Sequence, residues 1–138
     1  LSFLKEKQDA GAAFFITQLF FDNEYYFDFC AKAREAGITV PIIPGIMPVT
    51  SFRNIKRITE LCKSEIPEPF ERELEAREDD EAAVQDLGVA YATLQCVDLL
   101  ARGAPGIHFY TLNRSPATRA ILAALRAAKP WTRATQPV

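Results

Sequence analysis

Apolar runs alternate with helix-patterned segments along the chain. The run from Ala12 to Asp22 (AAFFITQLFFD) is apolar except near its end at Gln18, which predicts a strand buried on both faces. The run from Val40 to Pro48 (VPIIPGIMP) is also strand-like, and its prolines are easier to accept in a parallel strand whose ends lie at loops. Together with a third run, Gly106 to Leu112, the pattern predicts three strands.

Helical spacing and capping residues mark the segments between these strands. Asp22 is placed to cap a helix that Gly37 closes, and Thr50 or Ser51 to cap a helix that ends at Cys62. The other predicted elements are a helix end at residues 1–11 with Gly11 as C-cap, a short exposed helix in the charged stretch 64–80, a long helix over 80–102, a helix over 115–128, and a flexible tail at 130–138.

This order of elements predicts an α/β fold with parallel strands. A strand followed by a helix, three times over, gives crossover connections between parallel strands. Such units belong to a doubly wound sheet or to a (β/α)8 TIM barrel, and a whole barrel needs about 250 residues. A chain of 138 residues therefore holds about half a barrel.

Composition excludes several kinds of partner. Sixteen basic and eighteen acidic residues give a net charge of -2, so no basic field is available for nucleic acid or an anionic membrane. No apolar run approaches the ~18 residues of a membrane span. Cys30, Cys62 and Cys96 are far apart and lack a metal or redox spacing, which indicates reduced core thiols and a cytoplasmic location.

Polar residues gather where the predicted strands end, which is where parallel α/β folds bind ligands. Gln18 could hold a ligand or merely satisfy buried backbone, and Gly45 could be present only to permit a tight turn. Arg114 lies between a strand end and a helix start, where its guanidinium could face a carboxylate or phosphate. His108 lacks metal-ligand neighbours and is expected to be a packed, hydrogen-bonded residue.

Common catalytic motifs are absent from the chain. It contains no dinucleotide fingerprint, no Walker loop, no nucleophile elbow and no zinc-protease motif. The residue pattern alone indicates an anionic or polar ligand at the mouth of parallel strands.

Three sequence segments carry a family resemblance. DAGAAFFITQLFFD, GITVPIIPGIMPVTSF and PGIHFYTLNR, in this order, resemble the C-terminal half of the catalytic domain of the methylenetetrahydrofolate reductases, from Leu1 to about Leu125. The resemblance implies that residues 1–129 are the last three β/α units of a (β/α)8 TIM barrel that carries FAD. It also implies ping-pong hydride transfer from NAD(P)H through FAD to methylenetetrahydrofolate, giving methyltetrahydrofolate for one-carbon metabolism and methionine biosynthesis.

The same resemblance implies roles for individual residues. The substrate side is lined by Gln18, at the pterin ring, and by Asn54, Tyr110, Leu112 and Arg114. Lys7 matches a lysine near the FAD phosphates, and Ala12 matches a small residue beside the flavin region. Some bacterial relatives have a glutamine and a phenylalanine where this chain has Asn54 and Ile58, and an isoleucine cannot stack on a ligand ring.

The resemblance also implies that the chain lacks its catalytic residue. The family's general acid, a glutamate, and an aspartate that contacts flavin and pterin lie in the N-terminal half of the barrel. We therefore expect no catalytic residue and no metal ligand in this chain, partners that include that N-terminal half and a folate, and a homo-oligomer in the intact enzyme. The alternatives are a non-catalytic half barrel that pairs with itself or a partner and only binds folate or nucleotide, and a phosphate-binding barrel of another chemistry.

Overall fold

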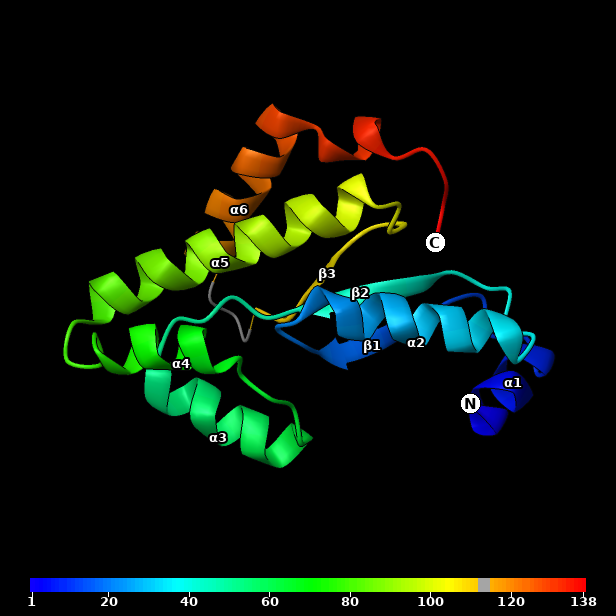
Figure 1. Cartoon of the computed structure of the whole chain (residues 1–138), viewed down its shortest axis with the longest axis horizontal. Helices are drawn as coiled ribbons and strands as arrows, with labels where there is room; N and C mark the ends of the chain where they lie inside the picture. Colours follow the sequence, from blue (N-terminus) through cyan, green and yellow to red (C-terminus); the bar gives the residue numbers. More distant parts are fainter. Residues whose placement is uncertain (112–114) are drawn as a thin grey trace.

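The three expected strands form one parallel sheet, described for residues 1–111 and 115–138 of a computed structural model (Figure 1). The strands β1 (Phe15–Leu19), β2 (Ile42–Ile46) and β3 (His108–Phe109) lie in the order β1-β2-β3. This confirms the predicted parallel α/β arrangement. The strand β3 is much shorter than the expected run over 106–112, because it pairs only with β2 and β2 itself ends at Ile46.

The helices follow the predicted order. They are α1 (Ser2–Asp9), α2 (Asn23–Glu35), α3 (Phe52–Cys62), α4 (Glu68–Glu75), α5 (Glu81–Ala101) and α6 (Ser115–Ala128), followed by the 3-10 helix η1 (Pro130–Arg133). The predicted caps are confirmed, because Asp22 accepts the Glu24 N–H at 3.0 Å and Ser51 accepts the Asn54 N–H at 3.3 Å. Gly37 follows α2 at φ +86, a backbone conformation that favours glycine.

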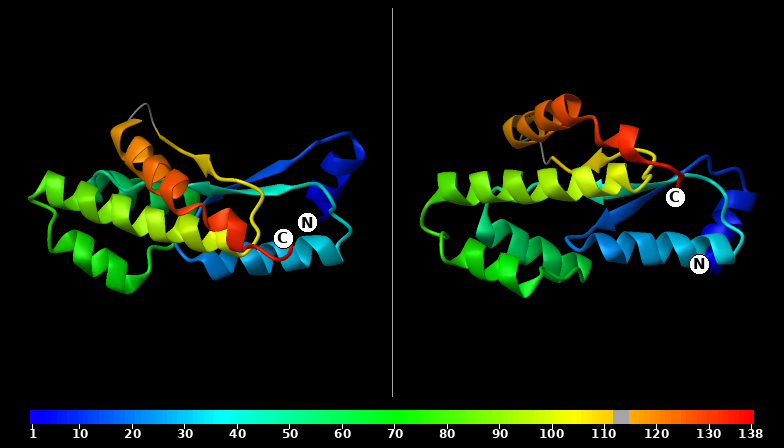
Figure 2. Two further views of the ribbon diagram at one scale, coloured as in Figure 1. Left: turned by 90° about the horizontal axis from the view of Figure 1, so that it is seen from above. Right: turned by 45° about the horizontal axis from the view of Figure 1, so that its top comes forward.

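One face of the sheet, which we call the packed face, is covered by helices. Its residues Phe15, Ile42, Ile46 and Phe109 belong to or pack against a cluster that includes buried side chains of α2, α5 and α6. In both views α2 and α5 run beside the sheet with α6 next to α5 (Figures 1 and 2). Burial on this scale is the main favourable term in folding.

The opposite face, which we call the open face, has little cover at β1. The strand register places Ile16, Ile43, Gly45 and His108 on this face, and side-chain alternation adds Phe14 and Tyr110, which flank β1 and β3. Phe14 is 52% exposed and Ile16 is 41% exposed, so the prediction that this strand is buried on both faces is wrong for the described chain. No helix of the described residues lies over this part of the sheet, and an apolar sequence run cannot reveal how many faces are covered.

A second hydrophobic cluster lies at the carboxyl ends of the strands. Leu19, Phe21, Met47 and Val49 meet Ile55 of α3, Phe70 and Leu74 of α4, and Val84 of α5. The stretch 64–80 was predicted to hold a short exposed helix, but Phe70 and Leu74 of that helix are buried and only its charged side faces solvent. At Gly88 of α5, a β-carbon would lie 1.9 Å from the Val49 carbonyl oxygen, so α5 approaches this strand end through glycine.

The last nine residues pack back onto the fold. Pro130 is buried in η1, and the Val138 N–H donates to the Gly103 carbonyl at 3.1 Å. Arg34 of α2 donates to the Val138 carbonyl at 3.2 Å (Figure 2 shows this end beside α5). These residues are not an extended tail, and their expected flexibility stays a prediction.

Candidate functional site

A hollow lies at the carboxyl ends of β2 and β3. It is lined by the chain after β2, by the start of α3 and by residues after β3, among them Thr50, Ser51, Asn54, Ile58, Tyr110 and Thr111. Asn54 is exposed and one helical turn from Ile58, so both can face a ligand in this hollow. The structure thus brings two of the predicted substrate residues, Asn54 and Tyr110, to one place.

Tyr110 crosses the central strand of the sheet. Its hydroxyl donates to the Thr17 carbonyl oxygen of β1 at 2.7 Å, and its ring forms an edge contact with His108 at 4.7 Å between centroids. A β-carbon at Gly45 would lie 2.6 Å from a Tyr110 ring carbon, so only glycine leaves room for this crossing. Burial raises the pKa of the Tyr110 phenol, which keeps the hydroxyl protonated and donating at neutral pH.

Gln18 lies next to the residue that Tyr110 contacts. Its side chain is exposed near the end of β1, so the reading in which it satisfies buried backbone is wrong for the described chain. The neighbouring Thr17 hydroxyl donates to the Gln18 carbonyl at 2.9 Å and accepts the Gly45 N–H at 3.0 Å. The Gln18 amide is therefore available to a ligand, on a backbone held by its neighbours.

The predicted cofactor residues lie at the other end of β1. Lys7 is in the last turn of α1 and Ala12 precedes β1, whereas Gln18 is near the end of that strand. The Lys7 ammonium lies 4.6 Å from the centroid of the Phe3 ring, and no carboxylate of the described residues pairs with it. The Ala12 N–H donates to the Lys7 carbonyl at 3.0 Å, which ties the two positions together.

Two predicted substrate residues, Leu112 and Arg114, lie outside the described residues. Their roles stay predictions. His108 is half-buried on the open face against Tyr110, and no hydrogen bond of its side chain is present among the described residues. The expected hydrogen-bonded core histidine is thus confirmed only in its ring packing.

The described residues contain no group of three or more potential metal ligands. Burial raises the pKa of the Cys96 thiol to about 12 and that of the Cys30 thiol above its ordinary value. Both thiols stay protonated at neutral pH, as structural cysteines do. None of the helices in the described ranges has both the length and the apolarity to cross a membrane.

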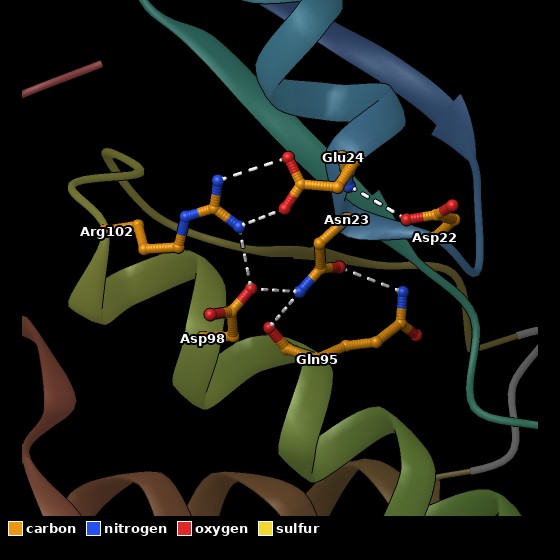
Figure 3. Close-up of polar contacts among 6 residues, drawn as sticks. All are labelled: Asp22, Asn23, Glu24, Gln95, Asp98 and Arg102. Carbon is orange, nitrogen blue, oxygen red and sulfur yellow. Dashed lines mark hydrogen bonds and ion pairs between the residues drawn. The ribbon is translucent and has the colours of Figure 1, made fainter.

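A polar cluster joins the start of α2 to α5 (Figure 3). Arg102 pairs with Glu24 at 2.6 Å and Asn23 donates to Asp98 at 2.9 Å. The buried Gln95 amide donates to the Phe20 carbonyl and to Asn23, each at 3.2 Å. These groups use one another as partners, which fixes the start of α2 against α5.

The fold and the hollow define a parallel α/β protein whose polar groups gather at the carboxyl ends of its strands. Residues 1–126 match the family model described as methylenetetrahydrofolate reductase, and the chain belongs to this family. The family expected from the three sequence segments is thereby confirmed.

Individual relatives agree with the family match. The chain is 48% identical over 126 residues to the Caenorhabditis elegans protein named "Probable methylenetetrahydrofolate reductase (NADPH)", covering 91% of this chain and 19% of that protein. It is 42% identical over 122 residues to the rice "Probable methylenetetrahydrofolate reductase (NADH)", covering 88% and 20%. It is 41% identical over 119 residues to the Escherichia coli "5,10-methylenetetrahydrofolate reductase", covering 86% and 40%. The chain thus spans about a fifth of the eukaryotic relatives and two fifths of the bacterial one.

Sequence reasoning missed how Thr17 and Gly45 take part in this region. Gly45 was read as a turn glycine, but it lies inside β2 and admits the Tyr110 ring. A usable signal was present, because a Pro-Gly pair inside a strand marks an interrupted ladder or a close backbone approach.

Proposed function

We propose that this chain is the C-terminal part of the catalytic barrel of a methylenetetrahydrofolate reductase and supplies much of its folate-binding side. The observation that carries the proposal is the grouping of Asn54 and Tyr110 in one hollow, with the exposed Gln18 next to the backbone that Tyr110 contacts. The family match supports folate as the substrate class.

The proposed barrel consists of eight β/α units, of which this chain would provide the last three. The parallel order β1-β2-β3 and the helix-covered packed face are compatible with a section of such a barrel. The exposed Phe14 and Ile16 of the open face would then point to the barrel interior and be covered by strands from the remainder. The short coverage of the relatives supports the same view.

Gln18 and Asn54 are proposed to recognise the polar edge of the folate. Each carboxamide offers an acceptor oxygen and a two-proton donor, which suits the alternating donors and acceptors of a pterin ring. Gln18 is exposed near the carboxyl end of β1, and Asn54 is exposed in α3, the helix that follows β2. A ligand can reach both side chains. Leu112 and Arg114 are proposed to line the same side, Arg114 by pairing with a carboxylate of the folate.

Lys7 and Ala12 are proposed to lie in the FAD site. The exposed Lys7 ammonium has no carboxylate partner among the described residues, so this position fits a phosphate group. FAD would supply the hydride that reduces the folate, with NADH or NADPH as the reductant and a ping-pong order. The relatives' printed names carry both nicotinamide forms.

The chain by itself is proposed to be inactive. Its carboxylates near the strand ends have structural partners: Asp22 caps α2 and Glu24 pairs with Arg102. Neither is placed to protonate a folate, so the general acid is proposed to come from the N-terminal part of the barrel. We also propose that the intact enzyme is a homo-oligomer and that it lies in the cytoplasm.

The test is Gln18→Ala in the polypeptide as its native source produces it. We expect folate turnover at subsaturating folate to fall about tenfold or more while the bound flavin is retained, since the lost hydrogen bonds are to the substrate. Gln136→Ala, which changes an exposed glutamine near the chain end, is the matched control. Equal loss of folate turnover and of flavin would refute the role of Gln18.

A native polypeptide that binds folate without any reductase activity would instead favour a non-catalytic half barrel. The open face supports this second candidate, because its exposed apolar residues need to be buried either by the rest of a barrel or by a partner.

A further inference from the structure

The ladder between β1 and β2 is interrupted where Gln18 lies. Phe15 pairs with Ile42 and Ile16 with Ile43, but the next pair is Leu19 with Gly45, so β1 has one extra residue. Pro44, which stands opposite this irregularity, has no N–H to donate to β1. Bulges of this kind redirect side chains and are frequent next to binding sites.

Side chains replace the missing ladder bonds. The Thr17 hydroxyl accepts the Gly45 N–H at 3.0 Å and donates to the Gln18 carbonyl at 2.9 Å. The Thr17 carbonyl accepts the Tyr110 hydroxyl at 2.7 Å. The bulge residues Thr17 and Gln18 are thus fixed by the Thr17 hydroxyl and by Tyr110, whose side chain extends across β2 from the end of β3.

The Tyr110 hydroxyl uses its one proton within the protein. Its one proton is donated to the Thr17 carbonyl, so toward a ligand the oxygen could only accept, and the absence of a side chain at Gly45 leaves room for this approach. The ring of Tyr110 still lines the hollow that holds Asn54.

We propose that Tyr110 is a positioning residue for Gln18, acting through the Thr17 backbone and the space left by Gly45. This inference rests on the proposed function in that Gln18 is taken to bind the folate. Tyr110 sets the conformation of the bulge that carries Gln18, and so couples the end of β3 to the end of β1.

The first experiment compares Tyr110→Phe with Tyr91→Phe in the polypeptide as its native source produces it. Tyr91 is the matched control, because its hydroxyl also donates to a backbone carbonyl, that of Phe21 at 2.6 Å, outside the bulge. Hydrogen exchange of peptides that cover Thr17–Leu19 should be about five- to tenfold faster in Tyr110→Phe and unchanged in Tyr91→Phe. Equal exchange of this segment in the two variants would overturn the proposal.

The second experiment measures saturation by folate and by NAD(P)H. Tyr110→Phe should raise the folate KM about three- to tenfold and leave the NAD(P)H KM within twofold, and this effect should vanish when Gln18→Ala is already present. If Tyr110 has a purely structural role, Tyr110→Phe should raise the folate KM equally with Gln18 present and in the Gln18→Ala variant. That result would overturn the inference. If Tyr110→Phe raises the folate KM but Gln18→Ala alone leaves it unchanged, the proposed function is contradicted.

A third pair of variants keeps the test decisive if Tyr110→Phe folds poorly. Thr17→Val removes the bridging hydroxyl at almost constant volume and should reproduce the faster exchange and the higher folate KM. Thr17→Ser keeps the hydroxyl and should restore both. Equal behaviour of the two Thr17 variants would count against a hydrogen-bonded bulge.

Discussion

The packed and open faces of the sheet both carry large apolar side chains, but their surroundings differ. On the packed face, Ile42 and Ile46 are 1% and 0% exposed beneath α2, α5 and α6. On the open face, Phe14 and Ile16 are 52% and 41% exposed. Apolar residues of the same strands are therefore buried on one side and accessible on the other.

This difference separates stability from ligand binding. The packed face accounts for most of the buried core, whereas the open face carries His108 and Tyr110 and leads to the hollow beside Asn54. Substitutions on the packed face should therefore lower the free energy of unfolding, and those on the open face should depend on what covers it.

The largest expected effect is that of Leu99→Ala. Leu99 of α5 is fully buried against the packed face, so its truncation should lower the free energy of unfolding by about 2–5 kcal/mol. Leu94→Ala on the same helix is the control, since Leu94 is 70% exposed and should cost less than about 0.5 kcal/mol. Urea unfolding measures both, and similar losses would show that α5 does not hold the sheet in this way.

Tyr26→Phe should have the next largest effect. The Tyr26 hydroxyl donates to the Ile42 carbonyl at 2.8 Å in the buried core, and its removal leaves that oxygen unsatisfied. We expect a loss of about 1–3 kcal/mol in urea unfolding. Tyr25→Phe, at a neighbouring and exposed tyrosine, should be neutral, and a neutral Tyr26→Phe would mean that water replaces the lost donor.

Ile16→Ala tests whether the open face is covered in a longer polypeptide. In the 138-residue chain it should cost less than about 1 kcal/mol, because Ile16 is 41% exposed, but about 2–4 kcal/mol where further strands bury it. Ile42→Ala on the packed face should cost the larger amount in both polypeptides. Equal costs of Ile16→Ala in the two would contradict a covering barrel.

The smallest effect is expected at the edge of the packed face. A hydrogen bond from Arg102 lowers the pKa of Glu24 below its ordinary value of 4.5, so the stabilisation by this pair is present above that value and is lost as the pH falls through the lowered pKa. Glu24→Gln should therefore melt slightly below the unsubstituted protein at neutral pH, and the difference should close in acid. Glu35→Gln, at an exposed glutamate of the same helix, is the control, and a pH-independent difference would exclude this cause.

Local rules predicted most elements of the fold. The caps Asp22 and Ser51 and the helix-ending Gly37 are set by nearby sequence, and all three are confirmed. The coverage of the first strand and the burial of Phe70 in α4 were predicted wrongly, because both depend on contacts between distant segments.

The candidate site was predicted less completely. The strand-end rule placed Gln18 and Tyr110 at the correct end of the sheet, and the family resemblance added Asn54. The hydrogen bond from Tyr110 to Thr17 joins residues 93 positions apart, and no periodicity of a single sequence records such a pair. Leu112 and Arg114 lie outside the described residues, so their placement stays a prediction.

The glycine contact of α5 has a consequence for motion. Because Gly88 sits against the Val49 carbonyl oxygen, sliding α5 along its axis by four residues, about 6 Å, would bring the side chain of Val84 or Ala92, on the same helix face, toward that oxygen. The Gly88 contact therefore favours the observed axial position of α5 on the loop after β2. We expect α5 and this loop to shift together in any motion that preserves this contact.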